Sequence, residues 1–301
     1  MPIYCKKCLS PAGGLSVDRL RQAHPGGECS PPTGTFAVNV QTASMSSFKV
    51  LQFNMQFGQN WSAANPDGAP VNLDLSIEEI RAHDADIVFL QEVEHACPDG
   101  VQPDPPPNFT RLREALAGYH GFFAYPRADP RELPFGIGQT ILSKAPLSCT
   151  VRRDLPSPTV EFSFKGEKRT PTDRLLIGAR TSVGGRLIQV FNTHLLALFM
   201  IDARGAEPAS QLELVVDEVR APEGPTLIGG DFNICQHDLL VRQFLAAGYR
   251  TVQDRHATWR RRPYVLDHLF YNRFLRPVRF AVEQTPASDH HMLTAEFEFA
   301  A

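Results

Sequence analysis

Three observations in the sequence predict an α/β fold built on a mixed sheet. The chain has 301 residues, of which 43% are hydrophobic and 21% charged, and this composition suits one large domain or two small ones with a sizeable core. Short runs rich in Val, Ile, Leu and Phe predict many strands. Amphipathic segments separate some of these runs and not others, so we expect both helical connections and hairpins.

Eight short apolar runs are predicted to be strands. They cover residues 48–54, 86–92, 138–144, 175–180, 186–192, 225–231, 264–271 and 292–299. The last run alternates polar and apolar residues, which is typical of an antiparallel strand with one buried face.

Four segments are predicted to be helices. Two of them begin with a capping box, formed by Ser76 with Glu79 and by Ser210 with Glu213, and apolar residues at helical spacing follow each box. The other two predicted helices cover residues 109–117 and 237–247.

Net charge and hydropathy exclude several classes of protein. The formal charge of −3 excludes a strongly basic nucleic-acid coat protein but allows a local basic patch. The apolar runs are far shorter than the roughly 20 residues that span a bilayer, and we find no basic-then-apolar leader. The six Cys are unevenly spread, unlike those of a disulfide framework. We therefore expect a cytoplasmic protein without a transmembrane segment, and peripheral lipid contact stays open.

Polar side chains stand at the ends of the predicted strands. Because each apolar run must be buried, its polar end reaches the edge of a sheet, where ligand sites of layered α/β folds collect. One such residue would mean little, but the pattern recurs at six places. The residues are Asn54, Glu92, His194, Asp231 with Asn233, Asp267, and Asp289 with His290. Their number predicts a converging site rich in oxygen donors.

The residue types point to metal-assisted phosphoryl chemistry. Carboxylate and amide oxygens without a nearby thiolate suit Mg²⁺ or Mn²⁺ better than Zn²⁺. Such a cation polarises phosphoryl oxygens, and a His–carboxylate pair activates water near neutral pH. Asp267 and His290 form that pair if their strands are neighbours, which the sequence alone does not establish.

The order of these motifs resembles that of a known superfamily. The motifs are LQFNMQF, FLQE, FGIGQTILSK, FNTHL, GGDFN, LDHLF and SDHH, spread over residues 48–299. They resemble the endonuclease/exonuclease/phosphatase superfamily, which includes deoxyribonucleases, abasic-site endonucleases, neutral sphingomyelinases and inositol-polyphosphate 5-phosphatases. The resemblance implies a four-layer α/β/β/α sandwich of two mixed, mainly antiparallel sheets. It also implies metal-dependent cleavage of a phosphate ester.

The resemblance also implies roles for individual residues. Glu92 is expected to be the main metal ligand, with Asn54 beside it. His194 stands where the superfamily contacts the scissile phosphate. Asp231 is expected to orient or deprotonate the attacking water, and Asn233 to donate a hydrogen bond to a phosphoryl oxygen.

The last two motifs supply the catalytic pair. Asp267 and His290 are expected to form a dyad in which His290 is the general base or a stabiliser of the transition state. Asp289 binds a second metal or tunes His290. One departure concerns Gln56, because the superfamily often has Asn or Asp there. The longer Gln56 side chain either reaches the metal through water or leaves that position vacant.

The first 30 residues hold a candidate zinc site. Its four ligands, of the kinds that tetrahedral Zn²⁺ prefers, are Cys5, Cys8, His24 and Cys29. We predict a zinc-knuckle-like appendage at 1–30, a linker at 31–47 and a catalytic domain at 48–301. The alternative is a catalytic domain that stands alone behind an appendage without zinc.

The substrate class depends on two segments with opposite character. Residues 250–279 contain eight Arg, which form either a basic rim for a polyanion such as nucleic acid or an ordinary solvated face. Residues 195–201 are apolar and form either buried packing or a wall for a lipid group. We predict a phosphodiester substrate, with a phospholipid or sphingomyelin head group and a phosphomonoester as alternatives. A catalytically inactive binding module on the same fold is the alternative of another class.

Overall fold

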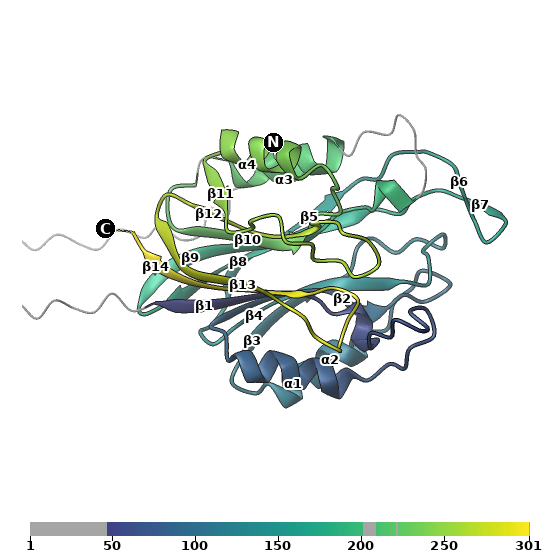
Figure 1. The fold of residues 1–301 in the computed structure, drawn as a ribbon, viewed down its shortest axis with the longest axis horizontal. Helices are drawn as coiled ribbons and strands as arrows, with labels where there is room; N and C mark the ends of the chain where they lie inside the picture. The colour runs from purple at the N-terminus through teal and green to yellow at the C-terminus, as the bar shows by residue number, and fades with distance from the viewer. Residues whose placement is uncertain (1–46, 201–208, 221, 301) are drawn as a thin grey trace, which may run out of the picture. The chain divides into compact units, whose positions relative to one another are not determined.

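The computed structural model describes residues 47–200, 209–220 and 222–300. In these residues two six-stranded sheets stack face to face, and a pair of helices covers the outer side of each sheet (Figure 1). The predicted four-layer α/β/β/α sandwich of two mixed, mainly antiparallel sheets is therefore confirmed.

The first sheet has the strand order β13-β14-β1-β2-β4-β3. Its strands are β1 (Phe48–Asn54), β2 (Ile87–His95), β3 (His120–Ala124), β4 (Gly136–Ser143), β13 (Leu275–Glu283) and β14 (Met292–Phe299). Only β1 and β2 pair in parallel, so these two strands end at the same edge of the sheet.

The second sheet has the order β11-β12-β10-β9-β8-β5. Its strands are β5 (Ser148–Leu155), β8 (Arg174–Val183), β9 (Arg186–His194), β10 (Thr226–Asp231), β11 (Tyr249–Thr251) and β12 (Asp267–Asn272). Here β9 and β10 form the one parallel pair. A separate hairpin of β6 (Phe162–Phe164) and β7 (Glu167–Arg169) projects from the sandwich (Figure 1).

The helices lie on the outer faces. They are α1 (Leu73–His83) and α2 (Pro107–Ala115) on the first sheet, and α3 (Ala209–Val219) and α4 (His237–Ala246) on the second. Two short 3-10 turns, η1 (Gln56–Gly58) and η2 (Leu198–Met200), follow β1 and β9. Among these helices of the described residues, none is long and apolar enough to cross a bilayer.

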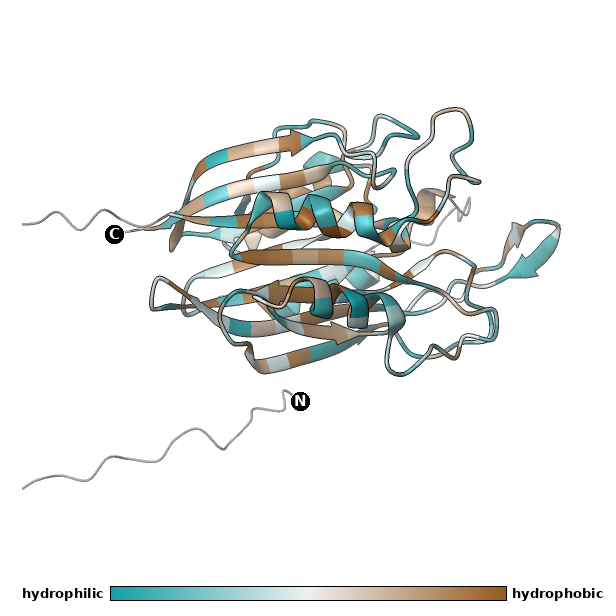
Figure 2. Ribbon diagram, turned by 90° about the horizontal axis from the view of Figure 1, so that it is seen from below, coloured by the Kyte–Doolittle hydropathy of each residue, from teal (hydrophilic) through white to brown (hydrophobic). Residues whose placement is uncertain are grey.

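Three apolar clusters hold the layers together. The central one lies between the sheets and includes Val50, Phe89, Ile177, Leu227 and Phe297. The two outer clusters bury the inner faces of the helices against the sheets. Figure 2 shows the hydrophobic residues concentrated along the strands, whereas the β6–β7 hairpin is largely hydrophilic. Burial of apolar area on this scale is the main force that stabilises the sandwich.

Most predicted elements are present, but both helix starts predicted from capping boxes are wrong. A strand occupies each of the eight predicted positions, and β3, β5, β11, β13 and the hairpin were not predicted. Helix α1 begins at Leu73, so Ser76 lies inside the helix and does not cap it. Leu73 and Ile77 are four residues apart and both buried in the outer cluster. That contact extends the helix by a turn beyond the capping box. Helix α3 begins at Ala209, so Ser210 is its second residue.

A buried row of polar side chains connects the two sheets. Gln52 of β1 and Gln91 of β2 exchange hydrogen bonds of 2.6 and 2.9 Å. Gln91 Nε2 donates to Asn192 Oδ1 of the second sheet at 2.6 Å, and Gln52 Nε2 donates to Asp267 Oδ1 at 3.1 Å. Asn192 Nδ2 donates back to two backbone carbonyls of the first sheet. Because buried polar groups must be paired, this row specifies how one sheet lies on the other.

Replacement of Asn192 by Ala tests this row. The substitution leaves one N–H of the Gln91 amide without a partner in a buried interface and removes the Asn192 donor from two backbone carbonyls. Each unsatisfied group costs about 1–3 kcal/mol. We expect the free energy of unfolding in urea to fall by at least about 2 kcal/mol. Gln284→Ala, at an exposed loop position, is the control and should change it by less than about 0.5 kcal/mol. Equal effects of the two substitutions would contradict a structural role for the row.

Candidate active site

The predicted site residues meet where the two parallel strand pairs end. Asn54 is the last residue of β1, and Glu92 follows Gln91, its cross-strand neighbour in β2. In the second sheet Asp231 is in register with His194 on one side and with Asp267 on the other. The carboxyl ends of β1, β2, β9 and β10 therefore place these side chains at one edge of the sandwich.

Asn54 connects the two sheets at this edge. Its Nδ2 lies 3.0 Å from Glu92 Oε1 and 3.0 Å from Asp231 Oδ2. Its Oδ1 accepts the backbone N–H of Gln56 at 3.2 Å. The Asn54 amide thus holds the carboxylates of Glu92 and Asp231, one from each sheet, close to each other.

A local distortion of β2 directs Glu92 into the site. The pairing of β2 with β4 shifts register between Gln91 and Glu94, and Glu92 has a φ of 50°. Such a bulge redirects a side chain at a cost in backbone strain. Gly136 of β4, which pairs with His95, lies against the displaced side chain, and a Cβ there would collide with Glu92. Glycine is therefore required at this position of β4.

His194 faces both carboxylates. Its Nε2 lies 3.8 Å from Glu92 Oε1 and 3.6 Å from Asp231 Oδ2. Burial and the charge of Arg174 lower the pKa of His194 well below its usual value, so the ring is neutral at pH 7. The side chains of His194 and Glu92 keep 13% and 17% of their surface exposed, whereas Asp231 keeps 1%. The site therefore opens to solvent on the side of His194 and Glu92.

Asp267 and His290 form the expected pair. His290 Nδ1 lies 2.8 Å from Asp267 Oδ2, and both side chains are buried. Asp267 opens β12 of the second sheet, whereas His290 precedes β14 of the first, so the strands are not neighbours. The pair forms across the sandwich. Its free nitrogen, His290 Nε2, lies 3.8 Å from Asp231 Oδ2.

Asp289 and Gln56 belong to the wall beside this pair. Asp289 Oδ2 accepts hydrogen bonds from Trp259 Nε1 at 3.1 Å and from Arg261 Nε at 2.7 Å, while its Oδ1 lies 4.0 Å from His290 Nε2. Gln56 Oε1 accepts the backbone N–H of Asp289 at 3.2 Å, and Gln56 Nε2 donates to the Gln59 side chain. Gln56 therefore joins η1 to the loop that carries Asp289 and His290.

Asn233 lies one turn beyond Asp231. Its backbone, at a φ of 51°, donates N–H to Asp231 Oδ1 at 3.0 Å. Its Nδ2 donates to the backbone carbonyl of Leu195 at 3.0 Å. One amide hydrogen of Asn233 stays available, and its contact with a phosphoryl oxygen stays a prediction.

The buried carboxylates have unusual proton affinities. Burial raises the pKa of Glu92 to about 7. Burial and the neighbouring Asp267 charge raise the pKa of Asp231 to about 7. Burial by itself would lower the pKa of His290, but the charges of Asp267 and Asp231 outweigh it and raise that pKa well above its usual value. A strongly polar cluster of this kind is typical of a functional site.

The donor set fits a hard divalent cation. Two groups of possible ligands share Asp231, and within each group the ligand atoms lie within 4.8 Å of one another. The groups are Glu92, His194 and Asp231, and Asp231, Asp267 and His290. Carboxylate and amide oxygens are the donors that Mg²⁺ and Mn²⁺ prefer. A cation between the carboxylates would also favour their charged forms and so offset the burial and the repulsion that raise their pKa values.

The sequence did not single out the residues that support this site. Gln52, Gln91 and Asn192 hold Asp267 and the strand ends in place, and Ser288 Oγ donates to the backbone carbonyl of Asn54 at 2.7 Å. The available signal was a polar residue inside an apolar run, as with Gln52 in FKVLQFN. Such a residue faces the interior and needs a buried partner.

Two predicted segments have different outcomes. The candidate zinc ligands Cys5, Cys8, His24 and Cys29 lie outside the described residues. The segment after His194 divides: Leu195 and Leu196 are buried, whereas Met200 in η2 is 57% exposed. Packing therefore explains the first half of this segment.

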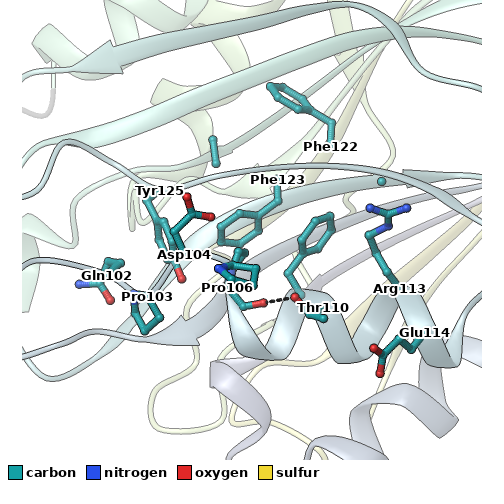
Figure 3. Close-up of a pocket in the computed structure, with 14 residues that line it drawn as sticks. Gln102, Pro103, Asp104, Pro106, Thr110, Arg113, Glu114, Phe122, Phe123 and Tyr125 are labelled. Atoms are coloured by element: carbon teal, nitrogen blue, oxygen red, sulfur yellow. Dashed lines mark hydrogen bonds between the residues drawn. The ribbon is translucent and has the colours of Figure 1, made fainter.

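A larger hollow lies outside the polar cluster. It has a volume of about 840 Å³ and is enclosed by the loop at 102–106, α2 and β3 (Figure 3). Its lining shares no residue with the cluster around Asp231. The polar cluster, and not the larger hollow, carries the residues suited to catalysis.

The family assignment agrees with this geometry. Residues 51–290 match the Endonuclease/Exonuclease/phosphatase family. The chain belongs to this family, whose members are metal-dependent phosphoesterases. A UPF0294 protein of Yersinia pseudotuberculosis is 28% identical over 198 residues, which cover 62% of this chain and 68% of that protein. A UPF0294 protein of Yersinia pestis matches equally.

Solved structures share the fold at low identity. An endonuclease/exonuclease/phosphatase protein of Beutenbergia cavernae has a TM-score of 0.63 at 21% identity, covering 85% of this chain and 72% of that one. The human Nocturnin catalytic domain with bound sulfate has a TM-score of 0.58 at 21% identity, covering 84% and 95%. A mannosyl-6-phosphatase of Bacteroides thetaiotaomicron has a TM-score of 0.60 at 17% identity, and the match covers 84% of this chain and 100% of that one. These likenesses show the sandwich fold.

The raised pKa values predict how cation binding depends on pH. Glu92 and Asp231 have pKa values of about 7. Below pH 7 protons therefore compete with a cation for the two carboxylates, and above pH 7 the carboxylates are free of protons. We expect Mn²⁺ to raise the melting temperature much more at pH 8 than at pH 6. Glu92→Gln should abolish most of the rise, and Glu218→Gln, on the exposed face of α3, should preserve it. A rise of equal size at both pH values would count against cation binding at these carboxylates.

Proposed function

We propose that this chain is a Mg²⁺- or Mn²⁺-dependent hydrolase that cleaves a phosphate ester, and specifically a phosphodiester, by attack of activated water. The observation that supports the proposal is that two groups of possible ligands meet at the buried Asp231. One group offers cation ligands, and the other contains a His–carboxylate pair. Phosphoester hydrolysis needs both parts within reach of one phosphate.

Glu92 and Asp231 would hold the cation with their carboxylate oxygens. Asn54 would join them only through Oδ1, which here accepts the backbone N–H of Gln56, since its Nδ2 faces both carboxylates. When bound, the cation polarises a phosphoryl oxygen and offsets the charge that develops in the transition state. His194 would contact the phosphate, and its position on the exposed side of the cluster supports this role. Asp289 is the candidate for a second cation or for tuning His290, although Trp259 and Arg261 already engage one of its oxygens.

The Asp267–His290 pair supplies proton chemistry. Asp267 accepts the Nδ1 hydrogen of His290 and favours the protonated ring, which leaves Nε2–H to point toward Asp231 and the substrate. A protonated His290 donates a hydrogen bond to a phosphoryl oxygen in the transition state. Asp231 is then the group that orients water and accepts its proton. Of the two predicted roles for His290, this arrangement supports the stabiliser of the transition state.

Other substrates use the same chemistry. A phospholipid or sphingomyelin head group is the first alternative, and a phosphomonoester is the second, since a fold neighbour is a mannosyl-6-phosphatase. An inactive binding module is the alternative of another class. It would have no need for two buried carboxylates and a buried His–carboxylate pair, which destabilise a fold unless they are paired.

Hydrolysis of a chromogenic phosphodiester tests the proposal. We expect turnover of bis(p-nitrophenyl) phosphate that EDTA abolishes and that Mg²⁺ or Mn²⁺ restores. Plasmid DNA, RNA, sphingomyelin, inositol phosphates and p-nitrophenyl phosphate then rank the substrate classes. Turnover that persists in EDTA, or no turnover of any of these esters with any divalent cation, would contradict the proposal.

Single substitutions test the roles of the residues. His290→Ala and Asp231→Asn each should lower kcat by at least about 100-fold, the usual size of a general acid–base contribution. Glu92→Gln should mainly raise the cation concentration needed for half-maximal activity. Glu218→Gln, on the exposed face of α3, is the control and should keep wild-type kcat. Near-full activity of His290→Ala would exclude the pair from catalysis.

A further inference from the structure

A second polar hollow adjoins the catalytic cluster. It has a volume of about 560 Å³, and we call it the Trp–Arg groove. Its lining consists of Trp61, Trp259, Arg260, Arg261, Arg262, Pro263, Gln284 and His291. Trp259 separates the groove from the catalytic pair, because its indole donates to Asp289 and its ring centre lies 6.4 Å from that of His290. The groove therefore adjoins the loop that carries Asp289 and His290.

The groove has positive charge that no carboxylate of the described residues neutralises. Arg261 is balanced, since it bonds to the carboxylates of Asp289 and Asp67. Arg260 and Arg262 form no ion pair with any carboxylate of the described residues. The Arg260 guanidinium lies 5.5 Å from the centre of the Trp61 ring. Two arginine charges are thus available to an anion.

The groove also has fixed aromatic surface. Trp259 is buried and packs against Phe199 and Tyr264, with ring centres 5.8 and 6.3 Å away. Trp61 is half-buried, and its backbone N–H donates to the carbonyl of Pro286 at 2.8 Å. Rings held in this way offer a stacking surface at little cost in conformational entropy.

A nucleotide matches this combination of groups. A base stacks on tryptophan or on the plane of an arginine, and arginines bind the adjoining phosphate. A lipid surface calls for a contiguous apolar patch, and the described lining contains no Leu, Ile, Val or Met. We propose that the Trp–Arg groove binds a nucleotide that flanks the scissile phosphate of single-stranded nucleic acid. The inference rests on the proposed function, because it names the substrate class of that site.

Binding measured without turnover tests the groove. The probe is a fluorescein-labelled oligothymidylate about eight nucleotides long, titrated with the full chain in EDTA and followed by fluorescence anisotropy. Trp61→Ala should weaken binding at least about 5-fold, and Trp61→Phe should recover most of the loss because stacking is kept. Arg260→Ala/Arg262→Ala should weaken binding further and lower the slope of log Kd against log salt by about 1.4, since each phosphate contact on a single strand contributes about 0.7.

A matched control removes the same charge elsewhere. Arg186 begins β9 and Arg276 pairs with Glu298, so both lie at the ends of strands remote from the site. The double substitution Arg186→Ala/Arg276→Ala should leave both affinity and salt slope at wild-type values. Melting temperatures of all variants show whether each is folded, and Arg260→Lys/Arg262→Lys keeps the charge if the alanine pair is unstable.

The outcomes separate this inference from the proposed function. Wild-type affinity and salt slope in Arg260→Ala/Arg262→Ala would overturn it, as would equal losses in the control pair. Binding of the wild-type chain to phosphatidylserine vesicles but not to the oligonucleotide would also overturn it, in favour of a lipid. Failure of the metal-dependent assay would remove the proposed function and leave the binding result intact, because binding is measured in EDTA.

Discussion

Burial of negative charge between two sheets is the constraint on which the rest of this structure depends. Asp231 and Asp267 are almost completely buried in neighbouring strands, and Glu92 approaches them from the opposite sheet. Carboxylates in such a place need donors or counter-charges. Asn54 supplies hydrogen-bond donors, and His290 supplies positive charge. A divalent cation would complete the balance, so the same imbalance that costs stability prepares the site for metal-assisted chemistry.

The donors that hold the carboxylates also hold the sheets. Gln52 bonds to Gln91 within its own sheet and to Asp267 across the interface, and Gln91 continues the row to Asn192. A shift of one sheet over the other would break these hydrogen bonds together. The geometry of the Asp267–His290 pair therefore depends on how the two sheets lie on each other. The bulge at Glu92 adds a second local cost. Strain and polar burial are concentrated at one edge, as at many functional sites.

The sequence predicted which residues form the site better than which strands bring them together. The polar ends of apolar runs identified Asn54, Glu92 and Asp231, and the structure brings all three together. The condition set for Asp267 and His290, that their strands be neighbours, did not hold, because the two residues approach from opposite sheets. Hydrophobic periodicity reports which face of a strand is buried, but it carries no information on which other strand lies opposite.

The sequence by itself determined eight of the described strands, the positions of the four helices and the identity of the residues at the strand ends, since these follow from local periodicity and residue chemistry. Only the tertiary structure decided that Gln56 bonds to the backbone of Asp289 and that Gly136 faces the Glu92 carboxylate. It also decided that Arg260 and Arg262 have no carboxylate partner among the described residues. Each of these depends on contacts between segments far apart in the chain, and their pairing is set by the packing of whole layers rather than by any local pattern.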